Sequence, residues 1–129
     1  MIVVDASAVV DLVCDARDAE ELRERLLTDG VAHAPHLLDI EVGGALRRLA
    51  AHGELSAARA ADALLDAVEL PILRYPHQPL IERAWELRGH LTIADGVYIA
   101  LAELLDATLL TSDARLARAG GHRARIEVV

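Results

Sequence analysis

Short apolar runs alternate with longer segments of helical periodicity along the chain. The run at residues 2–4 lacks the polar alternation of a half-exposed strand and predicts a buried strand, and further strands are predicted at residues 31–34, 70–75, 108–111 and 126–128. Apolar spacing, with Gly and Pro as boundaries, predicts helices at residues 6–13, about 18–29, 37–52, 57–68, 80–89, 93 or 95 to about 105, and 114–119. This alternation predicts one α/β domain over residues 1–129, with a short parallel sheet of four to five strands and helices on both faces.

Four acidic residues interrupt this pattern where a protein normally avoids charge. Asp5 ends the first apolar run, and Asp113 follows the run at residues 108–111. Asp95 opens a helical stretch, and Glu41 lies among apolar residues one turn into its helix. An unpaired buried carboxylate is strongly destabilising, so such groups normally need a cation or a proton.

The predicted topology brings these four acids to one edge of the sheet. Asp5 and Asp113 directly follow parallel strands, which end at the same edge. Asp95 faces that edge if its helix leads into the next strand, and Glu41 lies near the loop after the second strand. If the four carboxylates meet, a hard divalent cation with oxygen ligands would compensate their charge.

A simpler explanation exists for three of the acids. Taken singly, Asp5, Asp95 and Asp113 are each better explained as helix N-caps. Glu41 cannot be a cap, and the joint pattern therefore favours a shared site. Carboxylates that repel one another without metal should raise one pKa, so Asp113→Asn is expected to stabilise the metal-free domain.

Composition excludes several classes of function. All 13 basic residues are Arg, so a Walker-type or Schiff-base lysine is excluded. The net charge of −8 argues against a general nucleic-acid coat protein, although not against an enzyme with arginines at one cleft. The chain has no run long enough for a membrane span and no signal peptide pattern, and its lone Cys14 fits a reducing cytoplasm.

The acids also lie within an ordered set of short motifs. These are Asp5-Ala6-Ser7 after the first strand, Glu41 in the third helix, Thr92-Ile93-Ala94-Asp95 before Tyr98-Ile99-Ala100-Leu101-Ala102, and Leu110-Thr111-Ser112-Asp113 with Leu116-Ala117. The set resembles the PIN-domain ribonucleases, and more narrowly the VapC-type toxins of bacterial toxin–antitoxin pairs. It covers essentially the whole chain. One departure is Gly96, where such proteins commonly carry Ala, and it puts the stability of that helix in doubt.

The resemblance implies a fold, an activity and partners. The fold is a PIN-like three-layer α/β/α sandwich, and the activity is metal-dependent endonucleolytic cleavage of structured cellular RNA (tRNA, rRNA or mRNA). Asp5 and Asp95 would be the firmest ligands of Mg²⁺ or Mn²⁺, with Asp113 and Glu41 completing the site directly or through water. Ser7 and Thr111 would supply supporting hydroxyls. The implied partners are a second copy of the chain and a VapB-type antitoxin.

The helical hairpin at residues 37–68 indicates where such a partner would bind. It carries more apolar residues than one helix face needs, among them Leu49, Leu55, Leu64, Leu65 and Val68. We therefore expect an exposed apolar groove between the hairpin and the first helices. The resemblance implies that a C-terminal antitoxin segment lies across it, and an arginine there could compete with metal for the carboxylates.

Two other functions remain open. An aspartate-dependent phosphohydrolase would also place Asp5 after the first strand, but it needs a second acid where Ser7 stands. A non-enzymatic protein-binding α/β module would use the acids only as caps, and metal binding would distinguish it from the nuclease. A zinc site at His33 and His36 is disfavoured because Pro35 prevents a helical ligand pair.

The remaining arginines and aromatics have several interpretations. Arg47-Arg48 and the group Arg115, Arg118, Arg123 and Arg125 could contact RNA phosphate, line solvated faces or pair with an antitoxin. Trp85 is expected in the core or in a dimer contact. One Trp and two Tyr are too few for a base-stacking platform.

Overall fold

A five-stranded parallel sheet forms the centre of the computed structural model, which describes residues 1–15 and 19–129. The strand order is β3-β2-β1-β4-β5. The strands are β1 (Ile2–Val4), β2 (Ala32–Pro35), β3 (Ile72–Tyr75), β4 (Thr108–Thr111) and β5 (Arg125–Val128). The predicted parallel sheet is therefore confirmed, with boundaries that shift by one or two residues at β2, β3 and β5.

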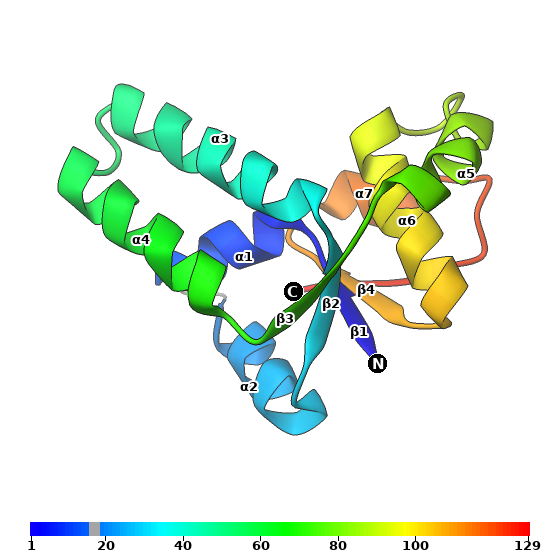
Figure 1. Cartoon of the computed structure of the whole chain (residues 1–129), viewed down its shortest axis with the longest axis horizontal. Coiled ribbons are helices and arrows are strands. Elements are labelled where there is room, and N and C mark those ends of the chain that lie inside the picture. Colours follow the sequence, from blue (N-terminus) through cyan, green and yellow to red (C-terminus); the bar gives the residue numbers. More distant parts are fainter. Residues whose placement is uncertain (16–18) are drawn as a thin grey trace.

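Helices cover both faces of this sheet (Figure 1). On one side lie α1 (Ala6–Val13), α2 (Ala19–Asp29), α3 (Leu37–Ala51) and α4 (Ala57–Glu69), of which α3 and α4 form a hairpin that projects beyond the sheet. On the other side lie α5 (Ile81–Glu86) and α6 (Ile93–Leu105), and α7 (Ala114–Arg118) packs against β5. The expected start of α2 near Asp18 lies outside the described residues. No helix in the described part of the chain is both long and apolar enough to span a membrane.

The helix predicted at residues 80–89 is shorter than expected. The chain forms a 3₁₀ turn, Gln78–Leu80, and then the six-residue helix α5. The last turn tightens because the N–H of Leu87 donates to the carbonyls of both Arg83 and Ala84. The consequence is that Arg88 lies in the loop between α5 and α6 rather than on a helix.

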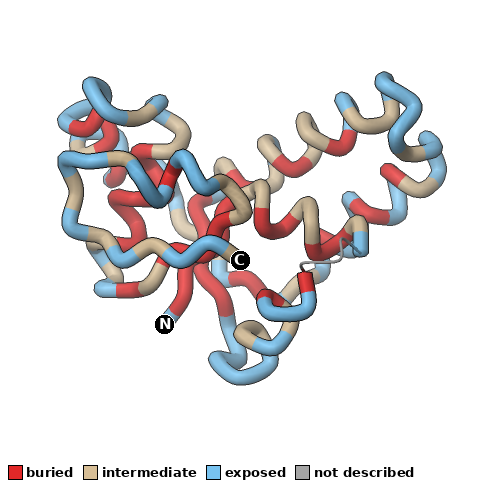
Figure 2. Tube along the Cα trace, turned by 180° about the vertical axis from the view of Figure 1, so that it is seen from behind, coloured by how far each residue is buried: buried red, intermediate tan, exposed pale blue. Residues whose placement is uncertain are grey.

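The core is centred on β1 and α6. All three residues of β1 are buried, and so are the consecutive residues 97–102 of α6 (Figure 2). This explains why neither segment shows polar alternation in the sequence. Among the described residues, the buried polar or charged ones are Asp5, His33 and Thr111. His33 is satisfied without a metal, because its Nδ1 lies 2.7 Å from the Tyr75 hydroxyl.

Glycine permits a close helix approach at Gly96. A Cβ atom there would lie 3.0 Å from the Cα of Ala84 on α5, so α5 and α6 pack more closely than Ala would permit. At Gly43, the nearest atom to such a Cβ would be the Leu64 Cδ1 at 3.9 Å, an ordinary contact. Gly43 on α3 is therefore not a point of close helix approach, whereas the departure at Gly96 has a packing reason.

Candidate active site

Asp5 lies at the carboxyl end of the central strand and caps α1. Its Oδ1 accepts hydrogen bonds from the Ser7 hydroxyl at 2.7 Å and from the Ala8 N–H at 3.0 Å, and its Oδ2 accepts from the Thr111 hydroxyl. The residue is only 6% exposed. Burial raises the pKa of this carboxyl, and the nearby charge of Asp95 raises it further, although the three hydrogen bonds oppose the shift. Asp5 is thus both a cap and a buried acid whose charged form is disfavoured.

Ser7 and Thr111 connect Asp5 to the loop after β4. The Thr111 Oγ1 accepts a hydrogen bond from the Asp113 N–H at 3.0 Å, and the Ser7 Oγ accepts one from the Ser112 N–H at 3.0 Å. The two hydroxyls themselves lie 3.2 Å apart. The sequence motifs that contain Asp5 and Asp113 are therefore joined into one hydrogen-bonded unit.

Glu41 lies one turn into α3 and faces the buried hydroxyl of Tyr98 on α6. Burial raises the pKa of Glu41, and the charges of Asp95 and Asp5 raise it further. The Tyr98 hydroxyl lowers this pKa, yet the contact falls short of a regular hydrogen bond. In return, burial and the charge of Glu41 raise the pKa of Tyr98, so this phenol stays protonated.

Asp95 is the third member of this coupled group. It is not the N-cap of α6, because that cap is Thr92, whose hydroxyl accepts the Asp95 N–H at 3.1 Å. The capping explanation is therefore wrong for Asp95. Its half-buried carboxylate lies close enough to raise the pKa of both Asp5 and Glu41. Three carboxylates from α3, α6 and the end of β1 thus repel one another at one edge of the sheet.

Asp113 has a different environment. It caps α7, and its carboxylate forms a two-point ion pair with Arg115, with N–O distances of 2.9 and 3.2 Å. The Arg115 hydrogen bond holds the pKa of Asp113 below its usual range. The raised pKa expected within the group therefore belongs to Asp5 and Glu41, and the stabilisation expected from Asp113→Asn has no basis.

Two surface pockets adjoin these acids. One of about 590 Å³ is lined by both Asp95 and Asp113, together with Arg88, His90, Arg115 and Arg118. The other, of about 320 Å³, is lined by Glu41 and Ser7, together with Asp11 and Arg48. The candidate site is therefore an open edge that is flanked by arginines on either side.

The acidic group fits a hard divalent cation by its chemistry. All of its donors are oxygen atoms, which Mg²⁺ and Mn²⁺ prefer, and a cation would offset the repulsion described above. Within residues 1–15 and 19–129, no three His, Cys, Asp or Glu side chains stand close enough to enclose a metal. Mg²⁺ is commonly held by one or two carboxylates and several waters, so this spacing is compatible with it.

Sequence reasoning missed three residues at this edge. Tyr98 and Asp11 are separated from the acids along the chain, and only their helical faces bring them near Glu41. Arg88 belongs to the helix predicted at residues 80–89, but it lies in the loop after α5, in a pocket with Asp95. The spacing of Asp11, four residues after Ser7 on α1, was the one signal in the sequence that indicated a shared face.

The chain is similar to known proteins over nearly its whole length. The PIN domain family matches residues 2–122. Ribonuclease VapC1 of Mycobacterium tuberculosis is 48% identical over 131 residues, which cover 98% of this chain and 96% of that protein. Ribonuclease VapC12 of the same species is 41% identical over 129 residues, which cover 100% of this chain and 99% of that protein.

Solved structures show the same fold. PAE2754 from Pyrobaculum aerophilum matches with a TM-score of 0.69 and 27% identity, covering 98% of this chain and 83% of that one. M. tuberculosis VapC20, described as a sarcin-ricin loop cleaving toxin, matches with a TM-score of 0.68 and 16% identity over 92% and 94% of the two chains. A chain of VapBC2 from Rickettsia felis, bound to a promoter DNA fragment, matches with a TM-score of 0.70 and 14% identity over 99% and 98%.

Proposed function

This chain belongs to the PIN-domain family, among the VapC-type ribonucleases, and on that premise we propose that it is a metal-dependent endoribonuclease that hydrolyses structured cellular RNA. The observation that carries the proposal is the mutual repulsion of Asp5, Glu41 and Asp95 at the carboxyl edge of the sheet. This repulsion destabilises the charged form of the domain, and a bound cation would offset it at neutral pH.

Asp5 is oriented for a cation by its hydrogen bonds. A carboxylate has about four acceptor positions. Three of them are filled by Ser7, Ala8 and Thr111, two on Oδ1 and one on Oδ2. The position left on Oδ2 would bind Mg²⁺ or Mn²⁺. The fixed side chain therefore presents one oxygen without a further loss of rotamer freedom.

The other acids would complete the site. Asp95 and Glu41 would bind the cation directly or through water, and Asp113 would join after Arg115 releases it. The bound metal supplies charge neutralisation at the phosphate and a water of lowered pKa. The protein groups position the ligands, and the Tyr98 hydroxyl faces Glu41 from α6.

A non-enzymatic protein-binding module is the alternative that the structure leaves room for. Asp5 and Asp113 cap helices, and they would do so in a domain without catalysis. Glu41 and Asp95 cap nothing, which favours the nuclease.

Asp95→Asn gives a direct test because it removes one charge without removing a cap. We expect at least a hundredfold loss of Mn²⁺-dependent RNA cleavage, the usual order for a catalytic group, and weaker Mn²⁺ binding by calorimetry. Asp62→Asn, on the exposed face of α4, is the matched control and should change neither. Cleavage that persists in chelator, or that Asp95→Asn leaves intact, would contradict the proposal. Sequencing of RNA 5′ ends after induced expression would then identify the target.

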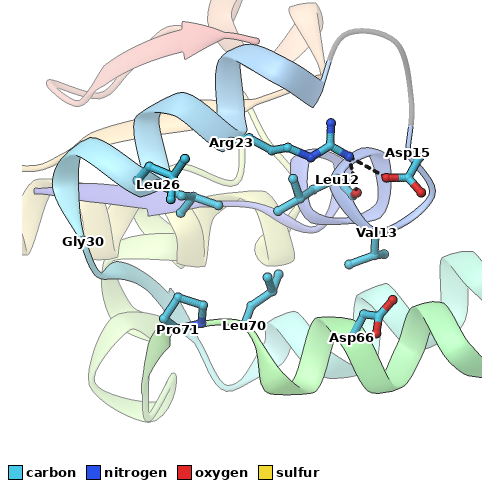
Figure 3. A pocket seen from close by; sticks show the side chains of 10 residues that line it. Leu12, Val13, Asp15, Arg23, Leu26, Gly30, Asp66, Leu70 and Pro71 are labelled. Carbon is cyan, nitrogen blue, oxygen red and sulfur yellow. Dashed lines mark hydrogen bonds and ion pairs between the residues drawn. The ribbon is translucent and has the colours of Figure 1, made fainter.

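The expected apolar groove lies between the hairpin and the first helices (Figure 3). It has a volume of about 520 Å³, and its apolar lining is contributed by Leu12 and Val13 of α1, Leu26 and Leu27 of α2, and Leu70 and Pro71 after α4. Of the hairpin residues predicted to be in excess, Leu65 and Val68 are 62% and 52% exposed. An exposed apolar groove of this kind marks an interaction site.

We propose that this groove binds a VapB-type antitoxin and that the chain forms a homodimer. Ion pairs at the rim, such as that of Arg23 with Asp15 at 2.6 Å, would set the polar boundary of the contact. The purified protein should sediment as a dimer, and the co-expressed antitoxin should block Mn²⁺-dependent cleavage. Leu26→Glu should release that block without reducing cleavage by the free enzyme. Full inhibition of this variant would place the antitoxin elsewhere.

A further inference from the structure

Arginines without an acidic partner gather near the candidate site. Most described arginines form ion pairs with carboxylates: Arg23, Arg25, Arg59, Arg74, Arg83, Arg115, Arg123 and Arg125. Within residues 1–15 and 19–129, Arg47, Arg48, Arg88 and Arg118 have no such pair. In a protein of net charge −8, these four are the cations most available to an anionic ligand.

Two of them share a pocket with the candidate metal ligands. Arg88 and Arg118 line the pocket of about 590 Å³ that also contains Asp95 and Asp113. Arg48 lines the smaller pocket beside Glu41, on the other side of the acids. A strand of RNA whose cleaved bond lies over the acids would therefore meet an unpaired guanidinium on each side.

Trp85 provides a flat apolar surface next to Arg88, which lines the first of these pockets. It is the single tryptophan of the chain and is 59% exposed, so of the two expected positions it does not occupy the core, and a dimer contact stays a prediction. The Arg88 guanidinium carbon lies 4.6 Å from the ring centroid, and its Nη1 donates to the Trp85 carbonyl at 3.0 Å. Tyr98 is buried and Tyr75 is bonded to His33, so Trp85 is the exposed member of the three Trp and Tyr side chains.

We propose that Trp85, Arg88 and Arg118 form a binding subsite for one nucleotide of single-stranded RNA that neighbours the cleaved bond. The two guanidinium groups bind its phosphate, and its base stacks against the Trp85–Arg88 pair. The proposal rests on the ribonuclease function above. It adds the path that the bound RNA strand follows from the acids into this pocket. A nucleotide suits this place better than an acidic peptide, because every nucleotide carries both an anion and a flat aromatic face in one unit.

Fluorescence of the single tryptophan reports on this subsite directly. Wild-type protein in chelator, which prevents cleavage, is titrated with a ten-nucleotide single-stranded RNA that carries a fluorescein for anisotropy. Stacking should quench tryptophan emission with the same dissociation constant as the anisotropy change. Trp85→Ala should weaken binding by about fivefold or more, the range measured for base stacking on an aromatic side chain.

The arginines are tested by salt dependence against a matched control. Arg88→Gln with Arg118→Gln should reduce the slope of log Kd against log salt by about 0.7 for each phosphate that an arginine no longer neutralises. Arg125→Gln is the control, because it removes an equal charge from an exposed arginine that pairs with Asp106 and lines a different pocket. It should leave the slope unchanged.

The outcomes separate this subsite from the proposed function. If wild-type protein cleaves RNA but its emission is not quenched, or if the double variant behaves like Arg125→Gln, the subsite is refuted and the nuclease stands. If no RNA is cleaved, the nuclease is refuted. Tryptophan emission that changes with protein concentration alone would assign Trp85 to an interface between copies of the chain. If the Arg88→Gln, Arg118→Gln variant binds RNA normally but no longer binds the antitoxin, the two arginines belong to the antitoxin interface. Either result would overturn the proposal.

Discussion

Gly96→Ala should destabilise the protein although alanine is the better helix former. A Cβ at this position would lie 3.0 Å from the Cα, 3.1 Å from the Cβ and 3.2 Å from the carbonyl oxygen of Ala84. Carbon atoms attract one another best at about 3.5–4.0 Å, so these contacts are repulsive. Two of the three opposing atoms belong to the backbone of α5, which cannot rotate away. The helices α5 and α6 would have to separate by several tenths of an ångström.

Two opposing free energies decide the sign. Replacing Gly by Ala inside a helix stabilises it by about 1 kcal/mol. Forcing an extra methyl group into a closely packed contact costs about 1–3 kcal/mol. With three close contacts we take the middle of that range, which leaves a net loss of about 1 kcal/mol in the free energy of unfolding. For a chain of 129 residues this lowers Tm by about 4 °C.

Gly43→Ala is the matched control for this prediction. It makes the same change inside α3, where the nearest atom to the new Cβ lies at 3.9 Å. The higher helix propensity of Ala, about 1 kcal/mol, should then be the only change in the free energy of unfolding, and Tm should rise by about 4 °C. Thermal melts by circular dichroism measure both variants. Gly96→Ala as stable as Gly43→Ala would refute the close-packing explanation and would leave helix propensity as the dominant effect.

Three further substitutions test the charges of the site and the core. Burial raises the pKa of Asp5 and Glu41, so in chelator the free energy of unfolding should fall as pH rises from about 4 toward neutrality. Glu41→Gln should flatten this fall in urea melts, and an unchanged slope would contradict the repulsion. Arg115→Gln frees Asp113 from its ion pair, so calorimetry should show Mn²⁺ binding tightened a few-fold, whereas weaker binding would contradict competition. Glu103→Gln removes a carboxylate that is 3% exposed and holds two arginines, so urea melts should show a loss of about 2 kcal/mol, and a loss near zero would mean that the pairs are dispensable.

Sequence patterns predict an element well when its own residues determine it, without contacts to other segments of the chain. The strand at Ile2–Val4 is predictable because a fully buried strand needs no polar alternation. The prediction of a helix over residues 80–89 is wrong at its end because hydrogen bonds that tighten at Leu87 decide the last turn, and no residue type in that stretch indicates this. In the sequence Gly96 indicates only a cost to helix stability, because its reason, the backbone of Ala84, lies on another helix.

The acids were predictable because charge in an apolar context is conspicuous along the chain. Their electrostatic roles were not, since the sequence does not show that the pKa of Asp113 is lowered by Arg115 whereas the pKa values of Asp5 and Glu41 are raised by burial. The same limit applies to the arginines. Arg125 and Arg118 look equivalent in the sequence, yet Arg125 pairs with Asp106, nineteen residues away, and Arg118 has no acidic partner among the described residues.

The distribution of these ion pairs bears on how an acidic protein could bind RNA at all. Its net charge of −8 repels a polyanion at long range, but at physiological salt that repulsion is screened beyond about 8 Å. Contacts within that distance then decide binding, and arginines already paired with carboxylates contribute little to them. Among the described residues, the unpaired Arg48, Arg88 and Arg118 of the pockets beside the acids would therefore provide the local attraction, and arginines paired with carboxylates would provide little. RNA should consequently bind at one place on this surface, and removing a paired arginine should affect it far less than removing Arg88.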